Sequence, residues 1–366
     1  MNARESDFDI AVIGGGPAGT SAAITAARFG ASVVLLEAGE FPRHKVCGEF
    51  VSAESLDVLR DLLRSTPEAE RLIATAPVIG RTRLLLGERV IEAEVSPPAL
   101  SITRFALDSL LWQAALAARA DARSSCEVRV IQGEGPFVLS TAAGQVHTSA
   151  VIVAAGRWSK FKPRTPVPNG PKWIGVKAHY RERHPARSTD LYFFEHGYCG
   201  VQPVADDVVN ACAMVRSDRA TSLEEVFKLH PALAARCSNW QRMMDPVTTA
   251  PLLYVPPQPV RDNIMFVGDA AAFIDPFVGD GISIALRSGR LAATDLCAFV
   301  DKRPSLASAL VAFDANYTRQ FRPLHTAASR IRGLLSWPAP ARILAFELLR
   351  APGLMRFVIR KTRQAG

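Results

Sequence analysis

A glycine-rich turn at residues 14–19, Gly-Gly-Gly-Pro-Ala-Gly, constrains this chain more than any other feature, because of the segments around it. A short apolar run, 8–13, precedes the turn, and an Ala-rich stretch of helical composition, 21–29, follows it. A second apolar run, 32–36, then ends at Glu37. Strand, glycine turn, helix, strand and acid within about thirty residues are the order of a dinucleotide-binding βαβ unit. We therefore expect an α/β chain with a dinucleotide site; a glycine-rich turn in an ordinary α/β unit is the alternative.

Each glycine of the turn has a distinct expected role. Gly14 permits the tight turn, Gly16 lets a pyrophosphate approach the backbone, and Gly19 lets the helix pack closely on the strand. Ala18 lies in the first helical turn, where free N–H groups and the positive end of the helix dipole favour phosphates. The Glu37 carboxylate is placed to accept hydrogen bonds from a ribose hydroxyl, and its charge disfavours a 2′-phosphate. We assign these five residues to the cofactor and do not expect NADP here.

The size and composition of the chain are those of an ordinary globular protein. Its 366 residues are 48% hydrophobic and 21% charged, enough for one large or two modest domains. The polar, acidic N-terminus is not a signal peptide, and no apolar run reaches the roughly eighteen residues that span a bilayer. Six cysteines lie scattered, without a C-x-x-C pair or a metal-like cluster with histidine. We expect a reduced cytoplasmic protein with no disulfide and no metal.

Positive charge is concentrated at the C-terminal end. From Arg319 onwards there are ten Lys and Arg residues against one acid, Glu347, whereas the whole chain has a net charge of +8. Aliphatic side chains and Trp337 alternate with these basic residues. The pattern fits a helical pair that packs its apolar face on the body, which we favour, or peripheral contact with an anionic membrane surface. Nucleic acid is not expected as a partner, because stacking aromatics are not interleaved with the charges.

Two strand-rich segments, near 77–98 and 165–255, interrupt the nucleotide-binding unit, and we expect them to form one sheet over the cofactor. Helices are expected at 53–64, 107–120, 222–237 and 281–300, and strands at 126–132, 137–140, 151–156 and 263–267. The expected domains are a nucleotide-binding domain (1–75, 100–160 and 260–320), a substrate domain (76–99 and 161–259) and a helical basic C-terminal segment (321–366). The predicted fold class is α/β: a Rossmann-like domain with an inserted strand-rich (α+β) domain and a helical C-terminus.

A second motif lies at 268–282, from Gly268-Asp269 after a buried strand to Gly281-Ile282 at the start of a helix. Together with the N-terminal turn and the segment 43–49, it resembles the flavoprotein superfamily of geranylgeranyl reductases, para-hydroxybenzoate-hydroxylase-type monooxygenases and flavin-dependent halogenases. The resemblance implies FAD as cofactor. Asp269 would accept hydrogen bonds from the ribityl or phosphate-side hydroxyls, unless it is only the N-cap of the helix after it. The N–H groups of Gly281 and Ile282 would face the flavin pyrimidine ring and stabilise its anionic reduced form.

The same resemblance implies further contacts with FAD. Arg104 matches a position that contacts the phosphate or ribose side, although a surface ion pair with Asp108, one helical turn away, would explain it too. Val128 matches a strand position whose backbone meets the adenine. Lys45 and Gly48 are assigned to the cofactor on the same basis.

The tripeptide Cys47-Gly48-Glu49 resembles the pattern of the geranylgeranyl reductase branch, in which the cysteine lies near the flavin. Cys47 would then line the cofactor or donate a proton; a small packing residue is the alternative. The Trp-x-Trp-x-Ile-Pro motif of halogenases is absent from the chain. These features place the resemblance nearest to the reductase branch.

Residues 198–203 resemble the Tyr-x-Trp-x-Phe-Pro motif that lines the lipid pocket of the reductase branch. Tyr198 and the proline are retained, but Gly200 replaces Trp and Gln202 replaces Phe. This departure argues against a geranylgeranyl chain as substrate. It enlarges the pocket and adds a hydrogen-bonding group, which suits an amphipathic or ring-bearing substrate. Tyr198 is a candidate proton donor, or simply a strand aromatic.

The resemblance implies an FAD-dependent oxidoreductase whose reduced flavin transfers hydride to an apolar or aromatic small molecule, at a carbon–carbon double bond of an isoprenoid, polyketide or similar secondary metabolite. Cys47 or Tyr198 would supply the proton. One alternative is a flavin-dependent monooxygenase that acts through a C4a-hydroperoxide. Another is a non-catalytic carrier of prenyl or lipid partners, against which the intact cofactor residues argue. Ala155-Gly156-Arg157 stands where the hydroxylases carry Asp-Gly, so the electron donor stays open between NAD(P)H, ferredoxin and free reduced flavin.

Overall fold

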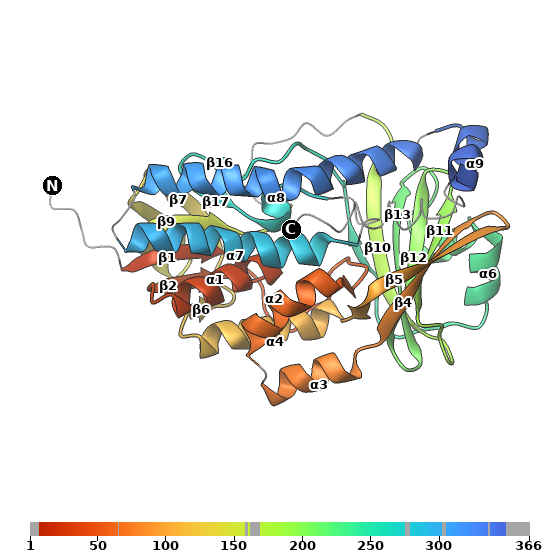
Figure 1. Ribbon diagram of the computed structural model, residues 1–366, viewed down its shortest axis with the longest axis horizontal. Coiled ribbons are helices and arrows are strands. Elements are labelled where there is room, and N and C mark those ends of the chain that lie inside the picture. The colour runs from red at the N-terminus through yellow and green to blue at the C-terminus, as the bar shows by residue number, and fades with distance from the viewer. Residues whose placement is uncertain are drawn as a thin grey trace.

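The computed structural model describes residues 7–64, 66–157, 160–161, 169–274, 279–301, 305–335 and 337–348. It contains two β-sheets with helices around them, which confirms the predicted fold class. Figure 1 shows the two sheets toward opposite ends of an elongated molecule, with most of the helices beside the first sheet.

The first sheet has a parallel core. β1 (Phe8–Ile13) pairs in parallel with β2 (Val33–Leu36) and with β9 (Gly144–Val153), and β17 (Ile264–Phe266) continues beyond β9. The remaining strands are β6 (Asp121–Arg123) beside β2, β16 (Val260–Arg261) beside β17, and β7 (Val128–Gln132) paired with β8 (Phe137–Thr141) next to β9. β1 and β2 are nearly continuous buried apolar runs, as expected for central strands of a parallel sheet.

Two helices, α1 (Pro17–Arg28) and α7 (Gly281–Val300), lie side by side and begin at the two glycine motifs. A Cβ on Gly19 would lie 1.7 Å from the carbonyl oxygen of Gly14, and one on Gly289 would lie 2.0 Å from that of Ala18. Gly14 itself has a φ of +108°, which favours glycine. The tight turn expected of Gly14 and the close packing expected of Gly19 are both present.

The second sheet is built from both strand-rich segments, as the sequence indicates. Its order is β14–β10–β13–β12–β11–β4–β5–β3, with β15 beside β10. β4 (Val78–Leu86) and β5 (Arg89–Ser101) form a hairpin, and β4 pairs in parallel with β11 (Ser188–Phe194) of the other segment. The other strands are β3 (Phe50–Val51), β10 (Trp173–Arg181), β12 (Gly197–Ala205), β13 (Val208–Arg216), β14 (Gln241–Arg242) and β15 (Val247–Thr249). Two short helices, α5 (Leu223–Phe227) and α6 (Pro231–Cys237), cover one face of this sheet.

Helix boundaries differ from expectation at two places. The helix expected at 107–120 is α4 (Arg104–Ala117); it begins earlier because the side chain of Thr103 caps it, accepting a hydrogen bond from the N–H of Ala106 at 3.3 Å. The single helix expected at 222–237 is two helices, α5 and α6, because His230 before Pro231 has an extended backbone. The helix expected at 53–64 is α2 (Ala53–Leu63), which is followed by α3 (Pro67–Thr75).

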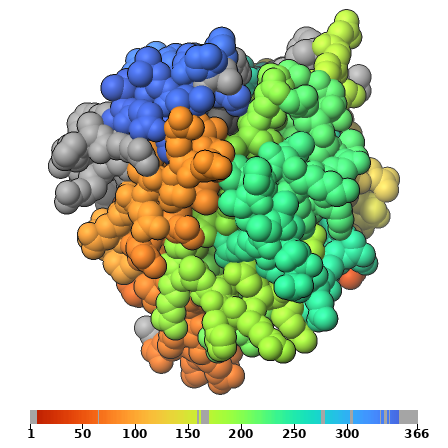
Figure 2. All heavy atoms as spheres, turned by 90° about the vertical axis from the view of Figure 1, so that its right-hand side faces the viewer, coloured from red at the N-terminus to blue at the C-terminus, as the bar shows by residue number. Residues whose placement is uncertain are grey.

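The described part of the C-terminal segment is helical and packs on the body. α8 (Leu306–Leu335) runs without a break through 320–321, where we expected a boundary, and α9 (Ala339–Leu348) follows it. Phe346 of α9 packs with Leu84 and Ile91 of the β4–β5 hairpin, and Figure 2 shows the blue C-terminal helices against this orange hairpin. Residues 349–366 lie outside the described residues. Within the described ranges, no helix is long and apolar enough to cross a membrane.

Candidate functional site

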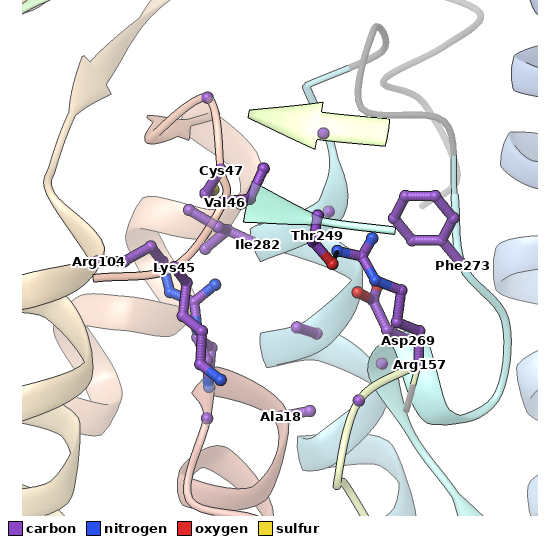
Figure 3. Close-up of a pocket in the computed structure, with 18 of the residues that line it drawn as sticks. Ala18, Lys45, Val46, Cys47, Arg104, Arg157, Thr249, Asp269, Phe273 and Ile282 are labelled. Atoms are coloured by element: carbon purple, nitrogen blue, oxygen red, sulfur yellow. Dashed lines mark hydrogen bonds between the residues drawn. The ribbon is translucent and has the colours of Figure 1, made fainter. Parts of the chain in front are cut away.

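A single cavity of about 880 Å³ connects the first sheet with the open face of the second. Every residue that we assigned to the cofactor or to catalysis lines it, except Gly19, which is buried at the packing contact described above. The cavity lies near the upper end of the usual size range for small-molecule sites. Figure 3 shows Cys47, Ile282, Arg104 and Asp269 converging on it from separate segments of the chain.

The turn before α1 leaves room for a phosphate group. A Cβ placed on Gly16 would have Arg104 Nη2, at 3.8 Å, as its nearest neighbour, so the space above the helix N-terminus is open. No side chain caps α1, whose first turn carries no acid. The free N–H groups and the helix dipole are therefore available to a bound anion. This cradle fits the pyrophosphate of a dinucleotide, as the sequence predicts.

Glu37 follows β2 and lies almost fully buried at the edge of the cavity. Its Oε2 accepts a hydrogen bond from the Gly15 N–H at 2.7 Å, and its Oε1 accepts from the Gly39 N–H and from Arg43 Nη1, both at 2.8 Å. Burial opposes ionisation, but Arg43 and the two backbone amides outweigh it and hold the pKa of Glu37 below its ordinary value. Glu37 thus presents a fixed carboxylate to the cavity. The contact with Arg43 was not predicted from the sequence.

Arg104 opens α4 and points toward the glycine turn. Its Nε and Nη2 donate to the two carboxylate oxygens of Asp108, both at 2.6 Å, so the ion pair that we considered as an alternative is present. It is not a surface pair, however, because Asp108 is completely buried. Arg104 also lines the cavity, and the two interpretations are therefore compatible. Lys45 lies close to it in Figure 3, and burial together with Arg43 lowers the pKa of Lys45.

The second motif frames the opposite wall of the cavity. Asp269 lies inside a short 3₁₀ turn, η1 (Gly268–Ala270), whose N-cap is Val267, so the N-cap interpretation of Asp269 is wrong. Gly281 and Ile282 begin α7, as predicted, and a Cβ on Gly281 would meet nothing within 4 Å. The part of the motif at 275–278 lies outside the described residues. Val128, at the start of β7, is buried and lines the cavity at its far end.

Cys47 lies where the two sheets meet. Its Sγ accepts a hydrogen bond from the Glu49 N–H at 3.3 Å, and burial raises the pKa of the thiol, which therefore keeps its proton at neutral pH. The Asn210 side chain on β13 donates to the carbonyl oxygens of Cys47 and Gly48, both at 3.0 Å. This loop is therefore fixed against the second sheet. Cys47 lines the cavity and also packs against the apolar core around the first sheet.

Tyr198 and the residues around it form the floor of the cavity on the second sheet. Tyr198, on β12, is 4% exposed and lies opposite Phe193 of β11 and Met214 of β13. Gln202, four residues along the same strand and on the same face, donates from Nε2 to Ser101 Oγ at 2.7 Å. The departures from the reductase motif, at Gly200 and Gln202, both line the cavity.

Successive rows of side chains across this floor differ in polarity. One row holds His179, Asn210, Gln202, Thr189 and Thr82, in register on neighbouring strands. The next row toward the other end holds Lys177, Cys212, Gly200, Leu191 and Leu84, and the third holds Gly175, Met214, Tyr198, Phe193 and Leu86. The floor therefore changes from hydrogen-bonding to apolar and aromatic along its length.

Three charged or titratable residues without an assigned role lie beside Cys47: Glu49, which belongs to the tripeptide motif described above, and Lys177 and His179, to which the sequence did not point. Glu49 is completely buried, and its carboxylate contacts Lys177 Nζ and His179 Nε2, the latter at 2.8 Å. Its Oε1 also accepts the backbone N–H of Arg104 at 2.9 Å. The available signal was the alternation in β10, where Lys177 and His179 are two residues apart and therefore share a face.

Arg157 also lines the cavity, although no role was predicted for it from the sequence. Its Nη2 donates to Thr249 Oγ1 at 2.6 Å, and its guanidinium lies 4.7 Å from the ring centroid of Phe273. Figure 3 shows it next to Asp269. Arg157 thus stands between the cofactor wall and the aromatic end of the floor.

Comparisons with known proteins agree with a flavin site. Residues 9–48 match the family model described as FAD dependent oxidoreductase. Conditioned medium factor receptor 1 of Dictyostelium discoideum is 25% identical over 331 residues, which are 82% of this chain and 65% of that protein. Digeranylgeranylglycerophospholipid reductase 1 of Methanopyrus kandleri is 24% identical over 376 residues, 96% of this chain and 99% of that protein.

The solved structures that resemble this chain share its fold. A triple mutant of the flavin-dependent brominase Bmp2 superposes with a TM-score of 0.81 at 20% identity, over 97% of this chain and 94% of that one. The cradle at α1, the carboxylate of Glu37 and the open N-terminus of α7 fit FAD, and the family match agrees with this cofactor.

Proposed function

We propose that this chain, an FAD-dependent oxidoreductase of the superfamily that includes geranylgeranyl reductases and flavin-dependent halogenases, reduces a carbon–carbon double bond of an amphipathic or ring-bearing small molecule. The observation that carries the proposal is the single cavity in which the cofactor residues and the floor of the second sheet meet at Cys47. FAD, when bound, supplies hydride chemistry. The rest of the reaction depends on residues of the chain.

A proton must reach the substrate carbon that does not receive the hydride. Cys47 is suited to donate it, because burial raises its pKa and keeps the thiol protonated. Tyr198 is the other candidate, since its ring lies in the floor of the same cavity. The protonated state of Cys47 also argues against a nucleophilic role, which needs a thiolate.

The floor supports an amphipathic substrate. Gln202, Thr189 and Thr82 offer hydrogen bonds in one row, whereas Leu84 and Leu191 in the next row, and the aromatic residues beyond it, offer apolar contact. We infer that a polar ring or head group lies against the first row and the apolar part along the others. The name of the Methanopyrus relative gives an isoprenoid lipid as its substrate, and Gln202 favours a more polar compound here.

A flavin-dependent monooxygenase or halogenase is the second candidate, and the structural similarity to a brominase favours it. The two reactions differ in how the reduced protein meets oxygen. We would reduce the purified protein anaerobically, mix it rapidly with oxygenated buffer and record spectra with a diode array. Slow, direct return of the oxidised spectrum supports the reductase. A transient near-ultraviolet band before that return would support the oxygen-using reaction, and a colourless purified protein would support a non-catalytic carrier.

We further propose an external electron donor and peripheral contact of the chain with a membrane surface. NAD(P)H, ferredoxin and free reduced flavin are the candidate donors, and anaerobic mixing with each identifies the one that bleaches the flavin. Trp337, between α8 and α9, and Leu344 and Leu348 of α9 are about half exposed or more. Arg342 belongs to the same helix, α9, and these residues together support peripheral contact with an anionic surface. Sedimentation with anionic and with neutral vesicles tests that contact.

A further inference from the structure

We propose that Glu49, Lys177 and His179 form a buried proton-holding site, in which His179 takes up one proton when the flavin is reduced and returns it to Cys47 after turnover. The proposal rests on the proposed function, because reduction of a double bond consumes one proton for each hydride.

The geometry of the site is that of a closed ion cluster. Both oxygens of the Glu49 carboxylate are bound: Oε1 by Lys177 Nζ and by the N–H of Arg104, and Oε2 by His179 Nε2 at 2.8 Å. Glu49 and Lys177 have no exposed side-chain surface, and His179 has 10%. Glu49 also has a φ of +62°, an uncommon conformation for a residue with a side chain. A local strain of this kind is retained when other contacts fix the residue.

The cluster can bind one additional proton, at His179. A buried Glu–Lys pair is neutral as a unit, and the imidazole of His179 is the member of the cluster with a ring nitrogen that can accept a further proton. Burial raises the pKa of Glu49. The hydrogen bonds and positive charges of His179 and Lys177 stabilise the carboxylate, outweigh burial and hold the pKa of Glu49 below its ordinary value. The carboxylate is therefore charged and can stabilise a His179 imidazolium through the hydrogen bond that already joins them.

Proton uptake is expected because a reduced flavin would place a negative charge in the adjoining cavity. Two-electron reduction with a single proton leaves one negative charge on the ring system, and a negative charge in a site of low dielectric favours protonation of a nearby base. The charged and titratable groups that face the cluster are His44, Arg104, Cys47 and Cys212, in addition to its own three members. Among these, His179 is the base in direct contact with the Glu49 carboxylate.

The cluster has one contact with His44 and another with Cys47, and both of these residues line the cavity. The ring of His44, which lines the cavity, meets the edge of the His179 ring at a centroid distance of 5.4 Å. On the other side, the backbone N–H of Glu49 donates to Cys47 Sγ at 3.3 Å. We infer that the proton enters past His44 and leaves toward Cys47.

The steps balance. A hydride donor reduces the flavin, and His179 binds one proton from solvent. Bound reduced FAD would supply hydride to one carbon of the double bond, and Cys47 would give its proton to the other, so that a C–H bond forms at each carbon and the π bond breaks. The Cys47 thiolate recovers its proton from the His179 imidazolium, which returns to the neutral form. The net change is the addition of one hydride and one proton to the substrate.

The test counts protons without any substrate. The midpoint potential of the bound FAD is measured by spectroelectrochemistry between pH 6 and pH 8.5, in the holoprotein and in His179→Gln, whose amide can still donate to Glu49. Each proton taken up with two electrons lowers the potential by about 30 mV per pH unit. We expect two protons per two electrons in the wild type around neutral pH, with the ultraviolet spectrum of an anionic reduced flavin. His179→Gln should take up one proton with the same spectrum.

The matched control is His147→Gln, a histidine of β9 that does not line the cavity. It should behave as the wild type. One proton in the wild type, or two in His179→Gln with an anionic spectrum, overturns the proposal.

If His179→Gln does not retain FAD, His44→Gln is measured by rapid dithionite reduction with a pH indicator. This variant should slow proton uptake without changing the number of protons, and an unchanged rate overturns the entry route. Because neither measurement contains a substrate, a wrong choice of substrate or reaction leaves this test unaffected.

Discussion

At the scale of single residues, several side chains serve the fold and the cofactor site at once. Arg104 binds the buried carboxylate of Asp108, and its backbone N–H binds Glu49. Its removal would leave a buried charge without its partner, which costs several kcal/mol whether or not FAD binds. Arg104 is therefore a poor residue with which to test the cofactor site. Glu37 is a better one, because its neutral analogue keeps the size and the hydrogen-bond acceptor.

We predict that Glu37→Gln weakens FAD binding at least tenfold. The substitution removes the negative charge that strengthens hydrogen bonds to ribose hydroxyls, and such charge-assisted bonds contribute about 1.5–3 kcal/mol. A tenfold change corresponds to about 1.4 kcal/mol. Titration of apoprotein with FAD, followed by flavin fluorescence, measures the affinity. Glu224→Gln, at an exposed carboxylate that pairs with Arg242 and does not line the cavity, is the control and should bind as the wild type does; equal affinity in Glu37→Gln would contradict the assignment.

The two candidate proton donors make a separate residue-scale prediction. We expect Cys47→Ala, Tyr198→Phe or both to slow substrate-dependent reoxidation of the reduced holoprotein about 100-fold, which is the lower end of the usual effect of a general acid. The reaction is followed anaerobically, by the return of flavin absorbance, with an unsaturated compound that oxidises the wild-type flavin. FAD content should be unchanged. Normal rates in both variants would show that neither residue donates the proton.

At the scale of elements, local sequence patterns were sufficient to predict the helices and strands at the two motifs. They were not sufficient to predict contacts between segments that are far apart in the sequence. The order of β1, α1 and β2 follows from the glycine turn, and the start of α7 follows from the second motif, because each depends on neighbouring residues. In the cluster of Glu49, Lys177 and His179, Glu49 lies 128 residues from Lys177 and 130 residues from His179 in the sequence. Its formation depends on how β10 lies in the second sheet and on which face meets the cavity. Neither is encoded in a local pattern.

Motifs predicted the candidate site better than they predicted side-chain partners. The assigned residues other than Gly19 line one cavity, but the bonds of Glu37 to Arg43 and of Asn210 to the Cys47 loop were not anticipated. The division of 222–237 into two helices had a visible cause in Pro231, which disfavours a helical conformation at the residue before it. The second sheet was predicted as one sheet, whereas its parallel β4–β11 pair was not.

The docking of α9 gives a prediction at the element scale. Phe346 is 6% exposed between Leu84 and Ile91, whereas Leu344 of the same helix is 63% exposed. We expect Phe346→Ala to lower the free energy of unfolding by roughly 3 kcal/mol, because it leaves a cavity against the β4–β5 hairpin. Leu344→Ala should change it by less than about 0.5 kcal/mol. Urea unfolding measures both; equal effects would mean that α9 is not packed on the hairpin.

At the scale of the whole molecule, the cavity lies at the junction of two sheets that have separate cores. The largest cluster of buried apolar residues surrounds the first sheet and extends along α8 to Phe321, Leu324 and Ala328, and a second lies between the other sheet and its short helices. The site is assembled from both sheets, since Glu37 belongs to the first and Tyr198 to the second. Stability of the whole fold and integrity of the site are therefore linked. Conditions that loosen α8 should affect both.

We expect acidic pH to loosen α8, because it favours protonation of His325, which is largely buried on this helix. Burial lowers the pKa of His325 to about 4 from an ordinary value near 6.5, and its Nε2 lies 3.4 Å from the hydroxyl of Tyr317. Between these two pH values the unfolded chain binds a proton that the folded chain does not. The free energy of unfolding is thus undiminished above pH 6.5 and falls as the pH decreases toward 4, by on the order of 3 kcal/mol.

Burial also lowers the pKa of His44, His196 and His230, but only for His325 is the shift large. We predict that His325 makes the largest contribution to this loss, and that the loss precedes the one from the buried carboxylates. Glu37 and Glu49 have lowered pKa values, so their contribution is present above the ordinary pKa of glutamate, about 4.3, and disappears only below it. Urea unfolding at pH 7.5, 6.5, 5.5 and 4.5 separates the two windows. His325→Gln should flatten the decline between pH 6.5 and 4.5, whereas the exposed His184→Gln should keep it. Parallel declines in wild type and His325→Gln would exclude His325 as the cause, and would leave the helix packing insensitive to protons in this range.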